Sequence, residues 1–285
     1  MNFKENKQID YVSLIYKHFG NVRRARGYYL YTDKGVRLLD MYLCDGRAVL
    51  GHKSSRIITA YKRELDKGLF GIFPTKTKSL LKRAVKELFP EYNSAIYATT
   101  QKAIYFSNLA MSHSKSNIEN MGANDLKDVQ IYRPFLNQNL KSLFLFLPYP
   151  SLSTTIVLYK NIDKTIFLEE DPILPFEASA ITSFIYDLIA HKRKYAIANS
   201  IKTKKMLKEE QHTQKELNKL LPKLKTFFNI EGHYLFFKKN IDIPYFEFFN
   251  VALENKILLS PSIEKPSIFP MINHYTQLLA FFNKY

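Results

Sequence analysis

The stretch Arg26-Gly-Tyr-Tyr-Leu-Tyr-Thr-Asp-Lys-Gly-Val-Arg-Leu-Leu-Asp40 contains two runs of β-forming residues separated by a turn. The runs cover residues 28–31 and 36–41. The Thr-Asp-Lys-Gly segment between them favours a turn, because Asp bonds to its own backbone and Gly adopts positive φ without strain. This stretch therefore predicts a β-hairpin near the N-terminus.

Amphipathic helices are predicted on both sides of the hairpin. Apolar residues recur at helical spacing within residues 10–20, 54–67 and 77–89. Ser54 or Ser55 can cap the second helix, because a serine hydroxyl accepts a hydrogen bond from a free amide of the first turn. Pro90 ends the third helix.

The rest of the chain alternates between strands and helices, which predicts an α/β fold. Strands are predicted at residues 129–132, 143–147, 155–159, 165–168, 233–237, 257–259 and 266–269. A long helix is predicted from Glu177 toward Pro222, with a break near Asn199, and shorter helices at residues 245–254 and from about Asn273.

Two groups of motifs resemble class III aminotransferases, the fold-type I pyridoxal-phosphate enzymes, and glutamate-1-semialdehyde aminomutases in particular. The hairpin is followed at the family's interval by Leu50-Gly-His52, and then by Lys67-Gly-Leu-Phe-Gly-Ile-Phe-Pro-Thr75. Downstream, residues 232–237 and 248–262 resemble the C-terminal domain of the same enzymes. Together the similar regions cover residues 24–103 and 230–285, about half of the chain.

The resemblance implies a reduced PLP-dependent-transferase-like fold with a truncated central domain and an α+β C-terminal domain. We expect an N-terminal aminotransferase-like segment at residues 1–100 and a reduced central α/β region at 101–175. A long basic helix at 176–226 and a small C-terminal domain at 227–285 would follow. Because family members pair through an extensive interface, the resemblance also implies a homodimer.

A pyridoxal-phosphate enzyme needs a lysine, an acid beside the ring nitrogen and amides that hold the phosphate. The family's phosphate turn is Ser-Gly-Thr-Glu-Ala, and the matching stretch here is Ala98-Thr-Thr-Gln-Lys-Ala103, without the glycine. Thr99 and Thr100 are the candidates for phosphate binding. The loop residues Phe70, Gly71, Pro74 and Thr75, with residues 99–102, would line what remains of the pocket.

The lysine and the acid have less obvious counterparts, because the family's central segment is much longer than the stretch between Ala103 and Gly232. Glu170 and Asp171 follow a predicted strand, and Lys192 and Lys194 lie downstream in an amphipathic helix. Our first hypothesis is a degenerate protein without the Schiff-base lysine, non-catalytic or altered in activity, that retains no cofactor. The alternative is an active aminotransferase or aminomutase that binds pyridoxal phosphate through these residues.

The net charge of +16 supports a third hypothesis. Residues 192–225 contain eleven Lys or Arg and three Glu, so Lys202 to Lys225 could bind nucleic acid or an acidic partner. AT-rich coding also raises lysine content, which weakens this argument.

Cysteine and histidine content excludes two kinds of site. Cys44 is the single cysteine, so no internal disulfide is possible, and the seven histidines lack zinc-site spacing. We interpret Cys44 as structural and His52 as a residue that fixes its loop. We expect no metal site and no membrane span. We expect the protein to be located in the cytoplasm.

Overall fold

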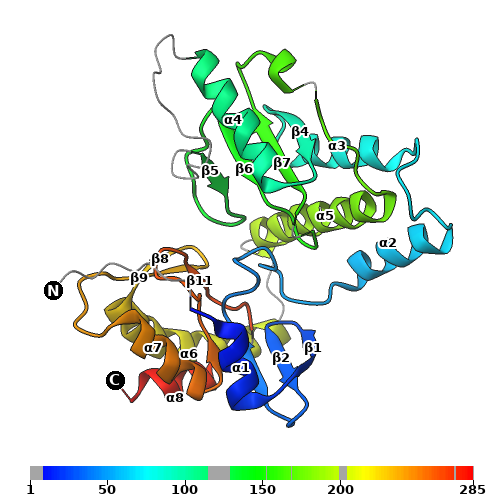
Figure 1. Cartoon of the computed structure of the whole chain (residues 1–285). Coiled ribbons are helices and arrows are strands. Elements are labelled where there is room, and N and C mark those ends of the chain that lie inside the picture. The colour runs from blue at the N-terminus through cyan, green and yellow to red at the C-terminus, as the bar shows by residue number, and fades with distance from the viewer. Residues whose placement is uncertain are drawn as a thin grey trace. The chain divides into compact units, whose positions relative to one another are not determined.

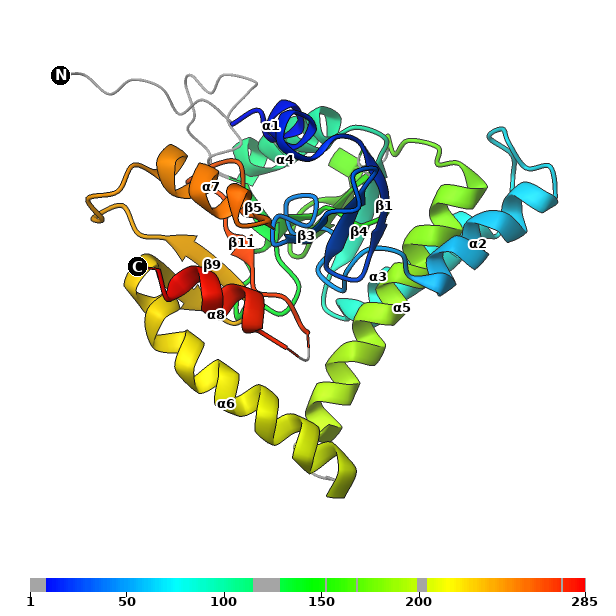
Figure 2. The same ribbon diagram turned by 90° about the horizontal axis from the view of Figure 1, so that it is seen from below.

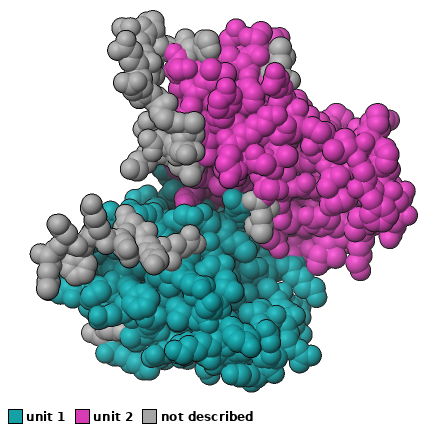
Figure 3. Space-filling view, viewed as in Figure 1, with its two compact units in different colours: residues 1–53, 135–137, 195–285 teal, residues 54–134, 138–194 magenta. Residues whose placement is uncertain are grey.

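The computed structural model describes residues 9–114, 129–151, 153–167, 169–198, 204–272 and 274–284. The chain forms two compact units (Figure 3). Unit 1 contains residues 1–53, 135–137 and 195–285, and unit 2 contains residues 54–134 and 138–194. Each unit thus combines stretches that are distant in the sequence. The four consecutive segments expected above stay a prediction.

Unit 2 is built around a four-stranded sheet with the strand order β4-β7-β6-β5 (Figure 1). The strands are β4 (Asn93–Tyr97), β5 (Gln130–Tyr132), β6 (Leu143–Phe146) and β7 (Thr155–Tyr159). β7 pairs antiparallel with both β4 and β6, and β5 pairs parallel with β6. Every residue of β6 and β7 is buried, as is typical of strands covered on both faces.

Helices cover the two faces of this sheet because successive side chains of a strand alternate between them. Leu145 and Val157 pack with α4 (Thr100–Ser114) in one apolar cluster. On the other face, Phe144 contacts Phe89 at the end of α3 (Thr77–Leu88), and Phe146 contacts Phe184 of α5 (Pro175–Ala198). The core of unit 2 therefore has two apolar layers.

Local chemistry explains the remaining elements of unit 2. Helix α2 (Ser55–Asp66) is capped by Ser54, whose Oγ accepts a hydrogen bond from the Ile57 amide, as expected. The strand predicted at residues 165–168 is wrong, since a 3-10 helix, η1 (Lys164–Phe167), occupies this position. The Asp163 carboxylate accepts the Thr165 amide at 2.9 Å and thereby favours a tight turn over an extended chain.

In unit 1 the predicted hairpin is confirmed and is part of a larger sheet. The sheet has the order β1-β2-β3-β10, with β1 (Val22–Arg26), β2 (Tyr29–Thr32), β3 (Arg37–Asp40) and β10 (Ile257–Leu258). Helix α1 (Tyr11–Phe19) precedes it and is capped by Asp10. β10 pairs parallel with β3, so the two regions that carry the family resemblance meet in one sheet.

The rest of unit 1 is a three-stranded sheet with helices and an aromatic core. The sheet has the order β11-β9-β8, with β8 (Phe228–Glu231), β9 (Tyr234–Phe237) and β11 (Ser267–Ile268). Helices α6 (Lys204–Phe227), α7 (Tyr245–Glu254) and α8 (Thr276–Phe282) complete it, and α8 lies alongside α6 (Figure 2). Phe248 is central to the core, with ring centroids of Phe227 and Phe237 each 5.1 Å away.

The predicted long helix is divided in the structure. α5 ends at Ala198 and α6 begins at Lys204, and the expected break near Asn199 lies outside the described residues. α6 also continues past Pro222 to Phe227 instead of ending near the proline. In the described part of the chain, no helix combines the length and apolar character needed to cross a membrane.

Candidate functional site

The stretch that resembles a phosphate-binding turn lies between a strand and a helix. β4 ends at Tyr97 and α4 begins at Thr100, so residues 98–103 form a strand-to-helix turn and the first turn of α4. Free amides and the helix dipole make this end of a helix attractive to anions. Thr99 and Thr100 therefore lie at a helix N-terminus, and their binding to a phosphate stays a prediction.

A carboxylate from the same chain already binds at this turn. Asp171 Oδ2 accepts the Ala98 amide at 2.8 Å, and Asp171 Oδ1 lies 2.5 Å from Lys102 Nζ. The Asp171 amide donates to the Ile96 carbonyl at 2.9 Å, which fixes the backbone of Asp171 beside β4. An anion at the start of α4 is thus supplied by Asp171.

The two threonines of the turn also have partners within the chain. Thr99 Oγ1 accepts the Lys102 amide at 3.2 Å, in the manner of an N-cap. Thr100 Oγ1 lies 2.9 Å from Thr155 Oγ1, at the start of β7. Both hydroxyl groups therefore hold the turn in place.

Three lysines surround the adjacent acidic pair. Glu170 forms ion pairs with Lys78 Nζ at 3.1 Å and Lys82 Nζ at 2.7 Å. Lys78 Nζ also donates to the Asp171 carbonyl at 3.0 Å. We call Lys78, Lys82, Lys102, Glu170 and Asp171 the Asp171 cluster. Lys78 and Lys82 were not predicted, although their spacing of four residues places them on one face of α3.

Electrostatics keep Asp171 ionised. Partial burial raises the pKa of its carboxyl, but hydrogen bonds from Lys102 and the Ala98 amide outweigh burial and lower the pKa below the ordinary value. Tyr97, which precedes the turn, is fully buried, and burial raises the pKa of its phenol. Its hydroxyl has no hydrogen-bond partner among the described residues.

The loop between β6 and β7 adds a second polar group at the same end of the sheet. Glu177 Oε1 accepts hydrogen bonds from the hydroxyls of Ser151 and Thr154, the latter at 2.6 Å. Thr155 of β7 pairs with Tyr97 of β4, so this loop and the α4 turn adjoin the same edge. Neither this loop nor the strands β6 and β7 on either side of it can supply a lysine for a Schiff base, because residues 142–159 contain none.

The candidate lysines lie elsewhere in unit 2. Lys192 is exposed on α5, and its Nζ lies 5.7 Å from the centre of the Tyr132 ring. Tyr132 ends β5, which is three strand spacings from β4, or roughly 14 Å. Lys194 also lies in α5, but its side chain is outside the described residues. The structure thus brings Thr99, Thr100, Glu170 and Asp171 together, and it places Lys192 apart from them.

The predicted pocket loop is an exposed apolar segment between α2 and α3. Phe70, Ile72 and Phe73 are 68%, 60% and 53% exposed. Pro74 is exposed as well, and Thr75 Oγ1 lies 2.7 Å from Thr77 Oγ1. A role for Phe70, Gly71, Pro74 and Thr75 in lining a pocket stays a prediction.

In unit 1, the geometry supports structural roles for His52 and Cys44. His52 Nε2 lies 2.8 Å from Asp40 Oδ2, and Asp40 Oδ1 accepts the amides of Tyr42 and Leu43. Burial, with a smaller effect of the Asp40 charge, raises the pKa of the Cys44 thiol to about 11. A thiol with that pKa is protonated near neutral pH and is a poor nucleophile.

Comparisons with known proteins find one relative that matches nearly the whole chain and aminomutases that match short stretches of it. An uncharacterized protein of Treponema pallidum (strain Nichols) is 30% identical over 307 aligned positions, which cover 95% of this chain and 96% of that protein. The glutamate-1-semialdehyde 2,1-aminomutase of Hyperthermus butylicus is 47% identical over 51 residues, which are 18% of this chain and 12% of the aminomutase. No family profile matches the chain.

Among solved structures, an ornithine aminotransferase from Plasmodium yoelii superposes with a TM-score of 0.63 at 15% identity, covering 96% of both chains. The resemblance to class III aminotransferases and the expected PLP-transferase-like α/β fold are therefore confirmed. The chain belongs to the family of the uncharacterized Treponema pallidum protein, and it has the fold of the class III aminotransferases.

Proposed function

We propose that this chain is a non-catalytic relative of the aminotransferases, in which an internal carboxylate has replaced the cofactor phosphate. The observation that carries the proposal is the position of Asp171. Its carboxylate takes the Ala98 amide and the Lys102 ammonium at the start of α4. A phosphate at the same turn would meet a like charge and would compete for the same donors.

The remaining residues of the turn do not fit pyridoxal phosphate as they stand. The hydroxyls of Thr99 and Thr100 are engaged, and the family's glycine is absent. The neighbouring loop between β6 and β7 supplies no lysine for a Schiff base, because residues 142–159 contain none. These features support a protein that uses the fold without the coenzyme chemistry.

The test is to incubate the purified protein with pyridoxal phosphate, desalt it and record the absorbance spectrum. We expect no stoichiometric chromophore, and borohydride treatment should label exposed lysines only partially and at several positions. One equivalent of cofactor, trapped by borohydride on a single lysine, would overturn the proposal. The Lys192→Ala, Lys194→Ala double variant would then show whether these lysines carry it.

An active pyridoxal-phosphate enzyme is the second candidate function. It is supported by the aminotransferase fold and by the proximity of Thr99, Thr100 and Asp171 at the turn. In that case Asp171 would release the turn when the cofactor binds. The same absorbance experiment separates the two candidates.

We further propose that the chain forms a homodimer and is located in the cytoplasm. The family resemblance implies a dimer, and the exposed apolar loop at residues 70–73 supports one, because large exposed apolar patches mark interaction surfaces. A single cysteine without a disulfide partner suits the cytoplasm.

A further inference from the structure

Arginine is unevenly distributed along this lysine-rich chain. The sequence has 32 lysines and only 10 arginines, yet Arg23, Arg24, Arg26 and Arg37 fall within fifteen residues. Coding bias that favours lysine does not explain a local concentration of arginine. This concentration therefore calls for a structural or functional reason.

The four arginines lie on the sheet of unit 1 beside two tyrosines. Arg24 is paired with Tyr31 across β1 and β2, and Tyr31 is paired with Arg37 across β2 and β3. The Arg24 guanidinium lies 4.5 Å from the centre of the Tyr31 ring, and the Arg37 guanidinium lies 4.4 Å from that of Tyr29. We call Arg23, Arg24, Arg26, Arg37, Tyr29 and Tyr31 the arginine–tyrosine face.

The arginines of this face have no carboxylate partner among the described residues. All four arginines are exposed, and none forms an ion pair with a carboxylate in the described part of the chain. By contrast, Arg56, Arg63 and Arg193 each pair with an acid. Guanidinium groups without an ion pair on a sheet surface remain available to an anionic ligand.

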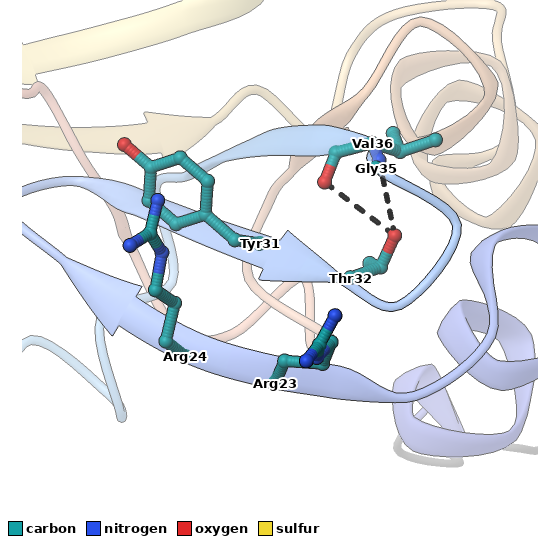
Figure 4. A pocket seen from close by; sticks show the side chains of 6 residues that line it. All are labelled: Arg23, Arg24, Tyr31, Thr32, Gly35 and Val36. Atoms are coloured by element: carbon teal, nitrogen blue, oxygen red, sulfur yellow. Dashed lines mark hydrogen bonds between the residues drawn. The ribbon is translucent and has the colours of Figure 1, made fainter.

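The face also contains a depression. Arg23, Arg24, Tyr31 and Thr32 line a pocket of about 490 Å³, next to the turn that holds Gly35 (Figure 4). The strand register shifts between Val22 and Arg24, which lets neighbouring arginines border the same pocket. Two hydrogen bonds between Thr32 Oγ1 and the Val36 backbone hold the turn in shape. This volume suits one nucleotide-sized group.

We propose that the arginine–tyrosine face binds single-stranded nucleic acid. Arginines would contact the phosphates, while bases would stack on the tyrosine rings or on the guanidinium planes. Two arginine–tyrosine stacks stand two residues apart on β2, roughly 7 Å, so successive bases each find a platform. Stacking requires unpaired bases, which favours a single strand over a duplex. The proposal does not depend on whether the chain binds pyridoxal phosphate.

The test measures the fluorescence anisotropy of labelled 20-nucleotide RNA and DNA strands titrated with the full chain at several salt concentrations. The Arg24→Ser, Arg26→Ser, Arg37→Ser variant should bind at least tenfold more weakly. Because three phosphate contacts are lost, the negative slope of log affinity against log salt should become shallower by about 2. The Tyr29→Leu, Tyr31→Leu variant should bind more weakly with a nearly unchanged salt slope.

A matched control removes three exposed charges from other positions, by Lys17→Ser, Lys62→Ser and Arg83→Ser. This control should retain affinity within about twofold, which supports the proposal. Equal loss of affinity in the control and the arginine variant would reduce the effect to net charge and overturn the proposal. So would equal binding by the arginine variant and the unaltered chain.

Three further measurements distinguish other occupants of the face. If Lys215→Ser with Lys219→Ser abolishes binding while the arginine variant retains it, the site is on α6 and the proposal is wrong. If the arginine variant changes the oligomeric state in light scattering, the face is an interface between copies of the chain, which contradicts the proposal. Binding to anionic lipid vesicles without binding to either oligonucleotide would equally contradict it. Circular dichroism confirms that each variant is folded.

Discussion

At the scale of single residues, Asp171 sets the state of the α4 turn. Its position next to Ala98 could not be predicted from the sequence, because 73 positions separate the two. Both Asp171 and Thr99 were nevertheless candidates. Asp171 follows the strand predicted at residues 165–168, which is a 3-10 helix in the structure, and Thr99 was chosen from the resemblance to the family's phosphate turn. What the sequence did not reveal was that Asp171 would accept hydrogen bonds from the Ala98 amide and from Lys102.

Asp171→Asn should lower the free energy of unfolding by about 1–2 kcal/mol at neutral pH, because the charged hydrogen bonds at the turn are weakened. The folded-state pKa of Asp171 lies below the ordinary value of 3.8. Its contribution is therefore present above that value and is lost as the pH falls through the folded-state pKa. Urea unfolding at neutral pH and below pH 4 measures this difference.

In that experiment the two proteins should approach each other in stability as the pH falls below about 4. The exposed carboxylate of Asp242, which has no ion pair in the described part of the chain, provides the matched control Asp242→Asn. A difference between Asp171→Asn and the unaltered chain that is the same at every pH would contradict the assigned role of the charge.

Gly232 is one of the positions in unit 1 that require a glycine. It adopts φ +60°, and a Cβ there would lie 2.7 Å from the Phe135 carbonyl oxygen. Gly232→Ala should therefore cost about 2 kcal/mol or more, from left-handed strain and the clash together. Gly68→Ala, at φ +72° with open space, should cost about 1 kcal/mol. If thermal or urea unfolding shows that both variants lose the same free energy of unfolding, the clash with Phe135 does not contribute.

At the scale of elements, amphipathic patterns predicted α2 and α3 almost to the residue, because a helix with one apolar face has the same period in any protein. The predicted strand at residues 165–168 was wrong because a single hydrogen bond from the Thr165 amide to Asp163 favours a turn there. β4 and α4 were not predicted as elements, and their burial arises from packing on β7 and β6.

The exposed loop between α2 and α3 leads to an element-scale prediction. If residues 70–73 are buried in a homodimer, the Phe70→Ser, Phe73→Ser variant should shift the protein from dimer to monomer in light scattering coupled to size-exclusion chromatography. Phe246→Ser, which removes a similarly exposed phenylalanine from α7, should leave the dimer intact. A monomeric unaltered chain at micromolar concentration would refute the prediction.

At the scale of the molecule, unit 1 joins the two ends of the chain. The Leu39 amide donates to the Lys256 carbonyl, and the Met41 amide donates to the Leu258 carbonyl, each at 2.8 Å. We predict that peptides containing residues 37–41 and 245–258 open with a common free energy in native-state hydrogen exchange, because they belong to one cooperative unit. Earlier exchange of the hairpin, with residues 245–258 still protected, would contradict this.

Local sequence was enough to predict the hairpin, a cap at Ser54 or Ser55, the amphipathic helices and the resemblance to aminotransferases. All of these depend on neighbouring residues or on matching motifs. Only the folded chain shows which distant groups meet: β3 pairs with β10, and Asp171 binds at the α4 turn. Long-range pairings depend on how buried faces pack across the chain, and no local period or propensity encodes the partner.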